Sequence, residues 1–194
     1  AKGDLSGVIG SVPPHIQSGE KKNPKIDEIW IDVGMSGEEA KAQIELGDKI
    51  SFVGPFTEME NNLVSSKAHD DRCCCVAIIK AAEQIKAYWE EHHLEPISLT
   101  VLLSAQEETG GLGAQTASFE TDPTQAIVVD VTFGTTPEIA DKHCGDLNKG
   151  AMIGMGATLS RRMARKLIEV GKEQNIPYQV EVMGGGHTGT NADG

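Results

Sequence analysis

Hydrophobic positions in the first part of the chain form short runs bounded by Gly, Pro and charged residues. Such runs at 7–12, 29–33 and 49–53 are typical of β-strands. A short helix is expected over 36–44, because a capping-box sequence begins at Ser36. The pattern therefore predicts a small β-rich module with one helix.

The longest helix is expected directly after two consecutive aspartates, Asp70 and Asp71. Apolar residues recur there at intervals of three and four, which predicts one face packed against a core. These positions are Cys75, Ile78, Ile79, Ala82, Ile85 and Trp89. The three consecutive cysteines at 73–75 are interpreted as small buried hydrophobic residues. Side chains about 100° apart around a helix could not close on one metal ion.

Strands and helices alternate over the rest of the chain. The expected order is a strand at 97–103, a helix at 113–119, a strand at 126–129, a helix capped by Ser160, and a strand at 178–182. This alternation is typical of an α/β fold with a doubly wound, mostly parallel sheet. The chain is therefore predicted to divide into a β-rich domain over 1–62 and an α/β domain over 63–194.

Charge and composition exclude several classes of protein. The chain of 194 residues carries 17 basic and 29 acidic residues, a formal net charge of −12, whereas nucleic-acid and membrane-surface binding require basic patches. No apolar run approaches the roughly 20 residues of a membrane helix, and no signal peptide is visible. The four cysteines match no disulfide or zinc-finger pattern. We therefore expect a cytoplasmic protein that binds neither nucleic acid nor membranes.

Acidic residues coincide with the ends of apolar runs at three places. Asp70 and Asp71 precede the long helix, Glu107 and Glu108 follow one predicted strand, and Asp130 ends the next. The carboxyl ends of parallel strands meet at one edge of a sheet, where ligands bind in α/β proteins. Carboxylates gathered there need a counter-charge, and divalent metal ions provide one.

Zn²⁺, Co²⁺ and Mn²⁺ accept carboxylate ligands, and a pair of such ions can make a shared water nucleophilic. On an extended segment Glu107 and Glu108 would point to opposite sides, so that one could bind metal while the other accepts a proton. Each acidic pair could instead simply begin a helix, where acids are favoured. Asp130 is harder to explain in that way, because a carboxylate that ends an apolar strand is costly without a partner.

Four motifs occur in order along nearly the whole chain. They are Lys67-Ala68-x-Asp70-Asp71-Arg72, Gln106-Glu107-Glu108-x-Gly110, Val129-Asp130-Val131-Thr132 and the Gly-rich stretch 184–190. Together they resemble the two-metal glutamyl or tetrahedral aminopeptidases, metallopeptidase family forty-two, some members of which carry endoglucanase labels. The resemblance implies a zinc-exopeptidase type of α/β fold with a small PDZ-like insert at the N-terminal end.

The resemblance also implies a role for each acidic residue. Asp70 would bridge two metal ions, and the peptide bond from Asp70 to Asp71 would be cis. Glu108 would bind one ion and Asp130 the other, while Asp71 would orient a ligand without binding metal. Glu107 would be the general base. The implied protein is a metal-dependent aminopeptidase that removes N-terminal residues from peptides through a water activated by two divalent ions, Zn²⁺, Co²⁺ or Mn²⁺.

The family uses two further metal ligands, both histidines, at positions that this chain does not contain. We therefore expect the chain to be a fragment that lacks both ends of the catalytic domain and is inactive alone. The resemblance also implies dimers that build a dodecamer. Two alternatives stay open, a non-catalytic assembly fragment and an endoglucanase-type glycoside hydrolase. The second is disfavoured, because the adjacent carboxylates of Glu107 and Glu108 do not straddle a bond as glycosidase carboxylates must.

Overall fold

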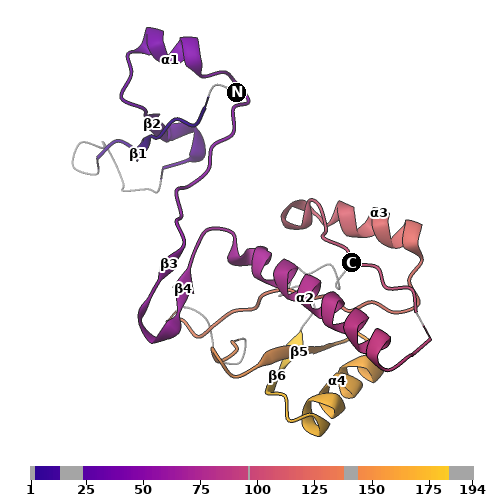
Figure 1. Cartoon of the computed structure of the whole chain (residues 1–194). Helices are drawn as coiled ribbons and strands as arrows, with labels where there is room; N and C mark the ends of the chain where they lie inside the picture. Colours follow the sequence, from indigo (N-terminus) through magenta and orange to yellow (C-terminus); the bar gives the residue numbers. More distant parts are fainter. Residues whose placement is uncertain (1–2, 14–23, 96, 138–143, 184–194) are drawn as a thin grey trace. The chain divides into compact units, whose positions relative to one another are not determined.

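The computed structural model describes residues 3–13, 24–95, 97–137 and 144–183. The chain divides into two compact units, Ala1–Val53 and Gly54–Gly194, each with both helix and strand (Figure 1). The predicted domain boundary after residue 62 falls inside the second unit and stays a prediction.

The first unit contains an antiparallel pair of strands. β1 (Val8–Gly10) pairs with β2 (Trp30–Asp32), and a 3-10 turn, η1 (Ile26–Glu28), precedes β2. Both strands lie in the predicted runs and confirm them. By contrast, no ladder within the described ranges includes the predicted strand at 49–53. The PDZ-like arrangement of this unit stays a prediction.

The short helix of this unit, α1 (Gly37–Gln43), begins at the predicted capping box. The Oγ of Ser36 accepts a hydrogen bond from the backbone N–H of Glu39 at 3.3 Å. The Glu39 carboxylate accepts one from the backbone N–H of Ser36 at 2.9 Å. Two backbone donors that the helix itself cannot satisfy are thus paired, which confirms the prediction.

The second unit holds the longer elements. They are β3 (Thr57–Glu58), η2 (Glu60–Asn62), β4 (Val64–Ser65), α2 (His69–Glu91), η3 (Glu107–Thr109), α3 (Leu112–Thr121), β5 (Ala151–Gly156), α4 (Arg161–Glu173) and β6 (Tyr178–Met183). The four helices and the strand β6 lie where the sequence predicts them. No helix among the described residues is long and apolar enough to cross a membrane.

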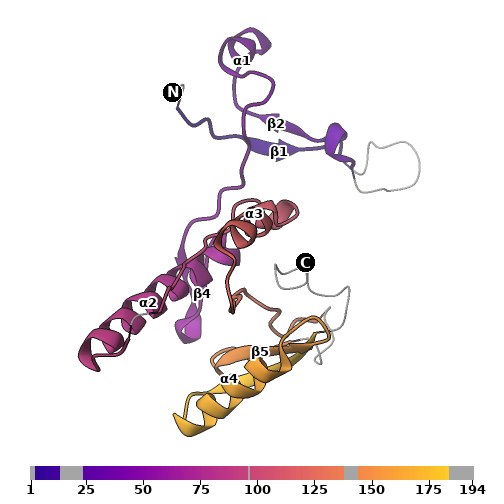
Figure 2. The same cartoon turned by 90° about the vertical axis from the view of Figure 1, so that its right-hand side faces the viewer.

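Among the described residues of this unit, the parallel pair β5–β6 is the one extended ladder. The strands run in register from Ala151 beside Tyr178 to Gly156 beside Met183, and α4 lies along them, packed on β5 (Figure 2). A strand, a helix and a parallel strand form the βαβ unit of α/β proteins. The α/β class is therefore confirmed. The strand β5 escaped prediction, because Gly154 and Gly156 interrupt its apolar run and glycine is unfavourable in strands.

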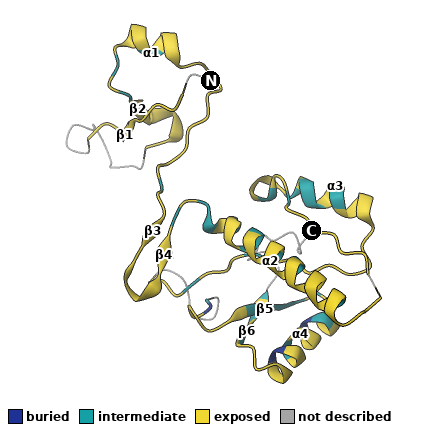
Figure 3. Cartoon of the chain, in the orientation of Figure 1, coloured by how far each residue is buried: buried dark blue, intermediate teal, exposed yellow. Residues whose placement is uncertain are grey.

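Two of the predicted strands are absent from the ladders of the described residues. Neither 97–103 nor 126–129 pairs with a neighbour, and both runs leave apolar side chains exposed (Figure 3). Leu103 is 50% exposed and Ile127 is 64% exposed. An apolar run predicts an extended segment whose side chains are stabilised by burial. A strand also needs a hydrogen-bonding partner for its backbone N–H and C=O groups, which the apolar pattern does not indicate.

Few of the described residues are buried. Among the apolar side chains of the described ranges, only Ala164 is fully within the core. On α2, the predicted inward stripe is half-buried at Cys75, Ile78, Ala82 and Trp89, while Ile79 and Ile85 are exposed. The described residues alone therefore form no sizeable core, because the apolar runs lack neighbours among them that would cover their side chains.

Candidate active site

Asp70 and Asp71 lie at the start of α2, before its regular part. The peptide bond between them is cis, which confirms what the family resemblance implies. Ala68, with φ 63° and ψ 33°, reverses the chain just before them, and neither aspartate has helical dihedral angles. Regular helix begins at Arg72, whose N–H donates to the carbonyl of Ala68 at 3.3 Å. Asp70 is exposed and Asp71 is half-buried.

Glu107 and Glu108 form a 3-10 turn, η3, and the predicted extended segment is wrong here. Gly110 and Gly111 have φ values of 121° and 67°, which fold the chain back on itself. The N–H of Gly111 donates to the carbonyl of Gln106 at 2.8 Å. Neighbouring side chains on a 3-10 turn point about 120° apart. The two carboxylates therefore still diverge, so the separate roles assigned to them remain available.

The turn is held closed at Gly113. Its N–H donates to the carbonyl of Ala105 at 3.0 Å, and a Cβ at this position would collide with the Ala105 backbone. We expect Gly113→Ala to break this contact and displace η3, at a cost of about 1–3 kcal/mol. Amide hydrogen exchange at Thr109 and Gly110 should accelerate. Gly134→Ala is the matched control, because a Cβ there meets open space. Equal exchange in the two variants would contradict this role of Gly113.

Asp130 directly follows the apolar run 126–129 and is half-buried. Its Oδ1 accepts a hydrogen bond from the N–H of Val131 at 2.7 Å. Burial raises the pKa of this carboxyl group, and the charges of Asp71 and Asp70 raise it further, while the bond from Val131 lowers it. Asp130 therefore lies within electrostatic reach of the aspartates at the start of α2.

The pKa of the Glu107 carboxyl group is raised by burial and by the charges of the other four acidic residues. Burial raises its pKa most, and the carboxylates of Asp130, Glu108, Asp70 and Asp71 add to the increase. An acid with a raised pKa opposes folding at neutral pH, where it is charged. That opposition falls as pH drops through the raised pKa, or when a cation binds nearby. The structure thus brings three segments, distant in sequence, into one field of negative charge.

This donor set fits divalent metal ions. All its ligand atoms are carboxylate oxygens, which suit Mn²⁺, Co²⁺ and Zn²⁺. Within the described ranges, Asp70, Glu108 and Asp130 do not place one oxygen each within 4.8 Å of the others. The arrangement that the family resemblance implies has two ions roughly 3.5–4 Å apart, with Glu108 and Asp130 on different ions, and it does not require all three oxygens to meet. The Gly-rich stretch 184–190 of the fourth motif lies outside the described residues.

The three cysteines after Asp71 are not buried as predicted. Cys73 is exposed, and Cys74 and Cys75 are half-buried thiols. Burial raises the pKa of the Cys74 thiol, and its contacts with Asp71 and Cys73 raise it further. The prediction failed because even Cys74 and Cys75, which lie on the less exposed side of α2, are only partly covered by other residues.

Comparison with known proteins identifies the chain as peptidase-like over its whole length. It is 35% identical over 187 residues to the lysyl aminopeptidase of Pyrococcus furiosus. The aligned region covers 93% of this chain and 51% of that protein. The solved TET aminopeptidase of Thaumarchaeota archaeon SCGC AB-539-E09 superimposes with a TM-score of 0.81 at 28% identity. That match covers 99% of this chain and 55% of the solved one.

A further solved structure, the dodecamer PhTET1-12s, superimposes with a TM-score of 0.70 at 31% identity. The match covers 98% of this chain and 56% of the PhTET1-12s chain. Residues 1–193 match the model of the M42 glutamyl aminopeptidases. The chain belongs to this family, as its motifs predict, and it spans about half the length of the relatives it matches.

Proposed function

We propose that this chain is part of a metal-dependent aminopeptidase that removes N-terminal residues from peptides with the help of two divalent ions. The observation that carries the proposal is the raised pKa of Glu107, to which acidic residues of three separate segments contribute. Such crowding of like charge is typical of functional sites and favours cation binding. Membership of a peptidase family supports the choice of a peptide substrate.

Each acidic residue has a separate task in this proposal. Asp70, Glu108 and Asp130 would hold the two ions, with Asp70 shared between them, while Asp71 would orient the ligands. When bound, two such ions polarise the peptide carbonyl and make a water nucleophilic. The carboxylate of Glu107 takes a proton from the attacking water. As the C–N bond breaks, Glu107 passes that proton to the leaving amine nitrogen.

We further propose that the 194 residues carry most but not all of the site. Exposed apolar runs such as 97–103 and 126–129 support this, because they need neighbours that the described residues do not supply. In the whole protein these runs would complete a doubly wound, mostly parallel sheet over 63–194, beside a PDZ-like domain at 1–62. The dodecameric state of PhTET1-12s supports a homo-oligomer of the same kind. The three cysteines at 73–75 form no disulfide, which favours the reducing cytoplasm as its location.

Removal of metal tests the proposed function. Chelation of the full-length protein should lower the release of N-terminal residues from peptides at least about 100-fold, and added Co²⁺ or Zn²⁺ should restore it. Hydrolysis of β-glucan oligosaccharides, assayed in parallel, should be absent. A chelator-resistant activity on the oligosaccharides would instead favour the glycoside hydrolase, which needs no transition metal.

The isolated chain tests whether the site is incomplete. Assayed with excess Co²⁺ or Zn²⁺, the 194 residues should show little or no turnover, because three carboxylate ligands hold two ions weakly. Robust turnover by this chain would contradict the proposal that ligands are missing. Metal binding without turnover, in both the chain and the full-length protein, would favour the non-catalytic assembly module.

A further inference from the structure

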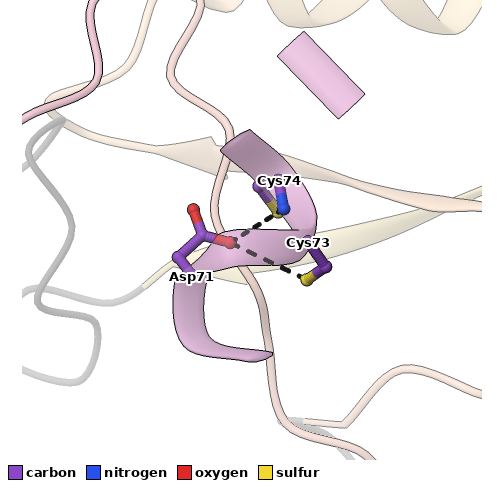
Figure 4. Close-up of side chains that lie close together, drawn as sticks. All are labelled: Asp71, Cys73 and Cys74. Carbon is purple, nitrogen blue, oxygen red and sulfur yellow. Dashed lines mark hydrogen bonds between the residues drawn. The ribbon is translucent and has the colours of Figure 1, made fainter. Parts of the chain in front are cut away.

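A second group of metal-ligand atoms lies beside the carboxylate cluster, at the first turn of α2. One carboxylate oxygen of Asp71 and the Sγ atoms of Cys73 and Cys74 all lie within 4.8 Å of one another (Figure 4). Consecutive side chains on a helix diverge by about 100°, which is why sequence analysis excluded a shared ion. Cys75 lies outside this group, so the exclusion of one ion shared by all three cysteines is not contradicted. An ion held by two of the thiols together with the non-helical Asp71 is a different arrangement, which the sequence analysis did not consider.

The Asp71 carboxylate is fixed in position over the thiols. Its Oδ1 accepts the N–H of Cys74 at 3.2 Å and lies 3.9 Å from the Sγ of Cys73. The Cys73 thiol also donates to the carbonyl of His69 at 3.0 Å. Backbone contacts therefore hold two of the three ligand groups before any ion arrives. Cys73 is exposed, so an ion can reach the group from solvent.

The separation between the Oδ1 of Asp71 and the Sγ of Cys73 suits ligation of a single ion. Zinc binds sulfur at about 2.3 Å and carboxylate oxygen at about 2.1 Å, so a 3.9 Å separation corresponds to an angle of about 125° at the metal. Two sulfurs and one oxygen leave a fourth position for water. Sulfur ligands select thiophilic cations, whereas the carboxylate cluster of Asp70, Glu108 and Asp130 offers only oxygen.

We propose that Asp71, Cys73 and Cys74 form a binding site for one thiophilic divalent cation of the Zn²⁺, Cd²⁺ or Co²⁺ type, distinct from the carboxylate centre. Binding replaces the two thiol protons, which pass to solvent, and forms two metal–sulfur bonds and one metal–oxygen bond. No redox step is involved. The site depends on this chain's own residues and would exist whether or not the chain is a peptidase.

Co²⁺ is a suitable probe, because thiolate ligation produces a sulfur-to-cobalt charge-transfer band in the near ultraviolet that carboxylate ligation does not. Titration of the 194-residue chain with Co²⁺, under a phosphine reductant, should produce this band and saturate at one ion per chain. Cys73→Ser and Cys74→Ser should each lose most of the band intensity. Asp71→Asn should keep the band and require a higher Co²⁺ concentration to reach it.

Cys75→Ser is the matched control, because Cys75 belongs to the same run but lies outside the group of three ligands. It should keep the full band, as should Cys144→Ser. Circular dichroism of each variant reports whether α2 still forms, so that loss of the band is scored only in folded protein. The proposal is wrong if the unaltered chain gives no band. It is also wrong if Cys75→Ser or Cys144→Ser removes the band while folded Cys73→Ser and Cys74→Ser variants retain it.

Discussion

Replacing Glu107 with glutamine should lower kcat of the full-length protein about 10²- to 10⁴-fold while leaving its metal content unchanged. Glutamine has the size of glutamate but cannot accept a proton at neutral pH. The proposed base would therefore be removed without opening a cavity in η3. Steady-state hydrolysis of peptides and elemental analysis of the purified protein measure the two quantities separately.

Glu108→Gln is the matched control for this variant, since it makes the same substitution one residue along the same turn. It should lose metal as well as turnover, because Glu108 is the proposed ligand. The pH dependence adds a further readout. A base works only when deprotonated, so kcat/KM should fall as pH drops through the pKa of Glu107, and Glu107→Gln should lack this acidic limb. Loss of metal from Glu107→Gln, with retention in Glu108→Gln, would reverse the two roles.

Helices were predictable here because their signals are local. The capping box at Ser36 and the cap at Ser160 lie within a few residues of the groups they satisfy. Asn175, in the left-handed region with φ 54°, ends α4 one residue after its cap. The signals for strands are not local. In sequence, the runs 97–103 and 126–129 resemble strands that pair. Whether they pair depends on segments elsewhere in the protein.

The motifs singled out five acidic residues as the candidate site. The charges of the other four contribute to the raised pKa of Glu107, so the five lie within electrostatic reach of it, and their separate roles stay predictions. The turn at Glu107 was missed, although the pair Gly110-Gly111 is a known signal for chain reversal. The thiol group beside Asp71 was missed for a different reason. It joins a non-helical residue, which precedes the regular helix, to two thiols of the first turn, and helical spacing alone does not indicate that combination.

Replacing Asp70 with asparagine should weaken the binding of both metal ions at least about tenfold, because even residues that only support a metal ligand are worth 10- to 100-fold in affinity. A carboxylate that bridges two ions contributes one anionic oxygen to each, whereas an amide offers a single neutral oxygen. Equilibrium dialysis of the full-length protein with Zn²⁺ or Co²⁺ measures the loss. If Asp70 bridges, both ions should be lost together, and turnover should fall with them.

Asp70→Asn has a second consequence that needs no metal. The charge of Asp70 helps to raise the pKa of Glu107 in the metal-free chain, so its removal should lower that pKa, as measured by NMR titration of carboxyl carbons. Asp122→Asn removes the same charge from an exposed position in the same unit. Asp122 does not contribute to the raised pKa of Glu107, so this variant should change neither that pKa nor the binding of metal. If Asp70→Asn keeps both ions yet lowers the pKa of Glu107, then Asp70 belongs to the acidic cluster without bridging the metals.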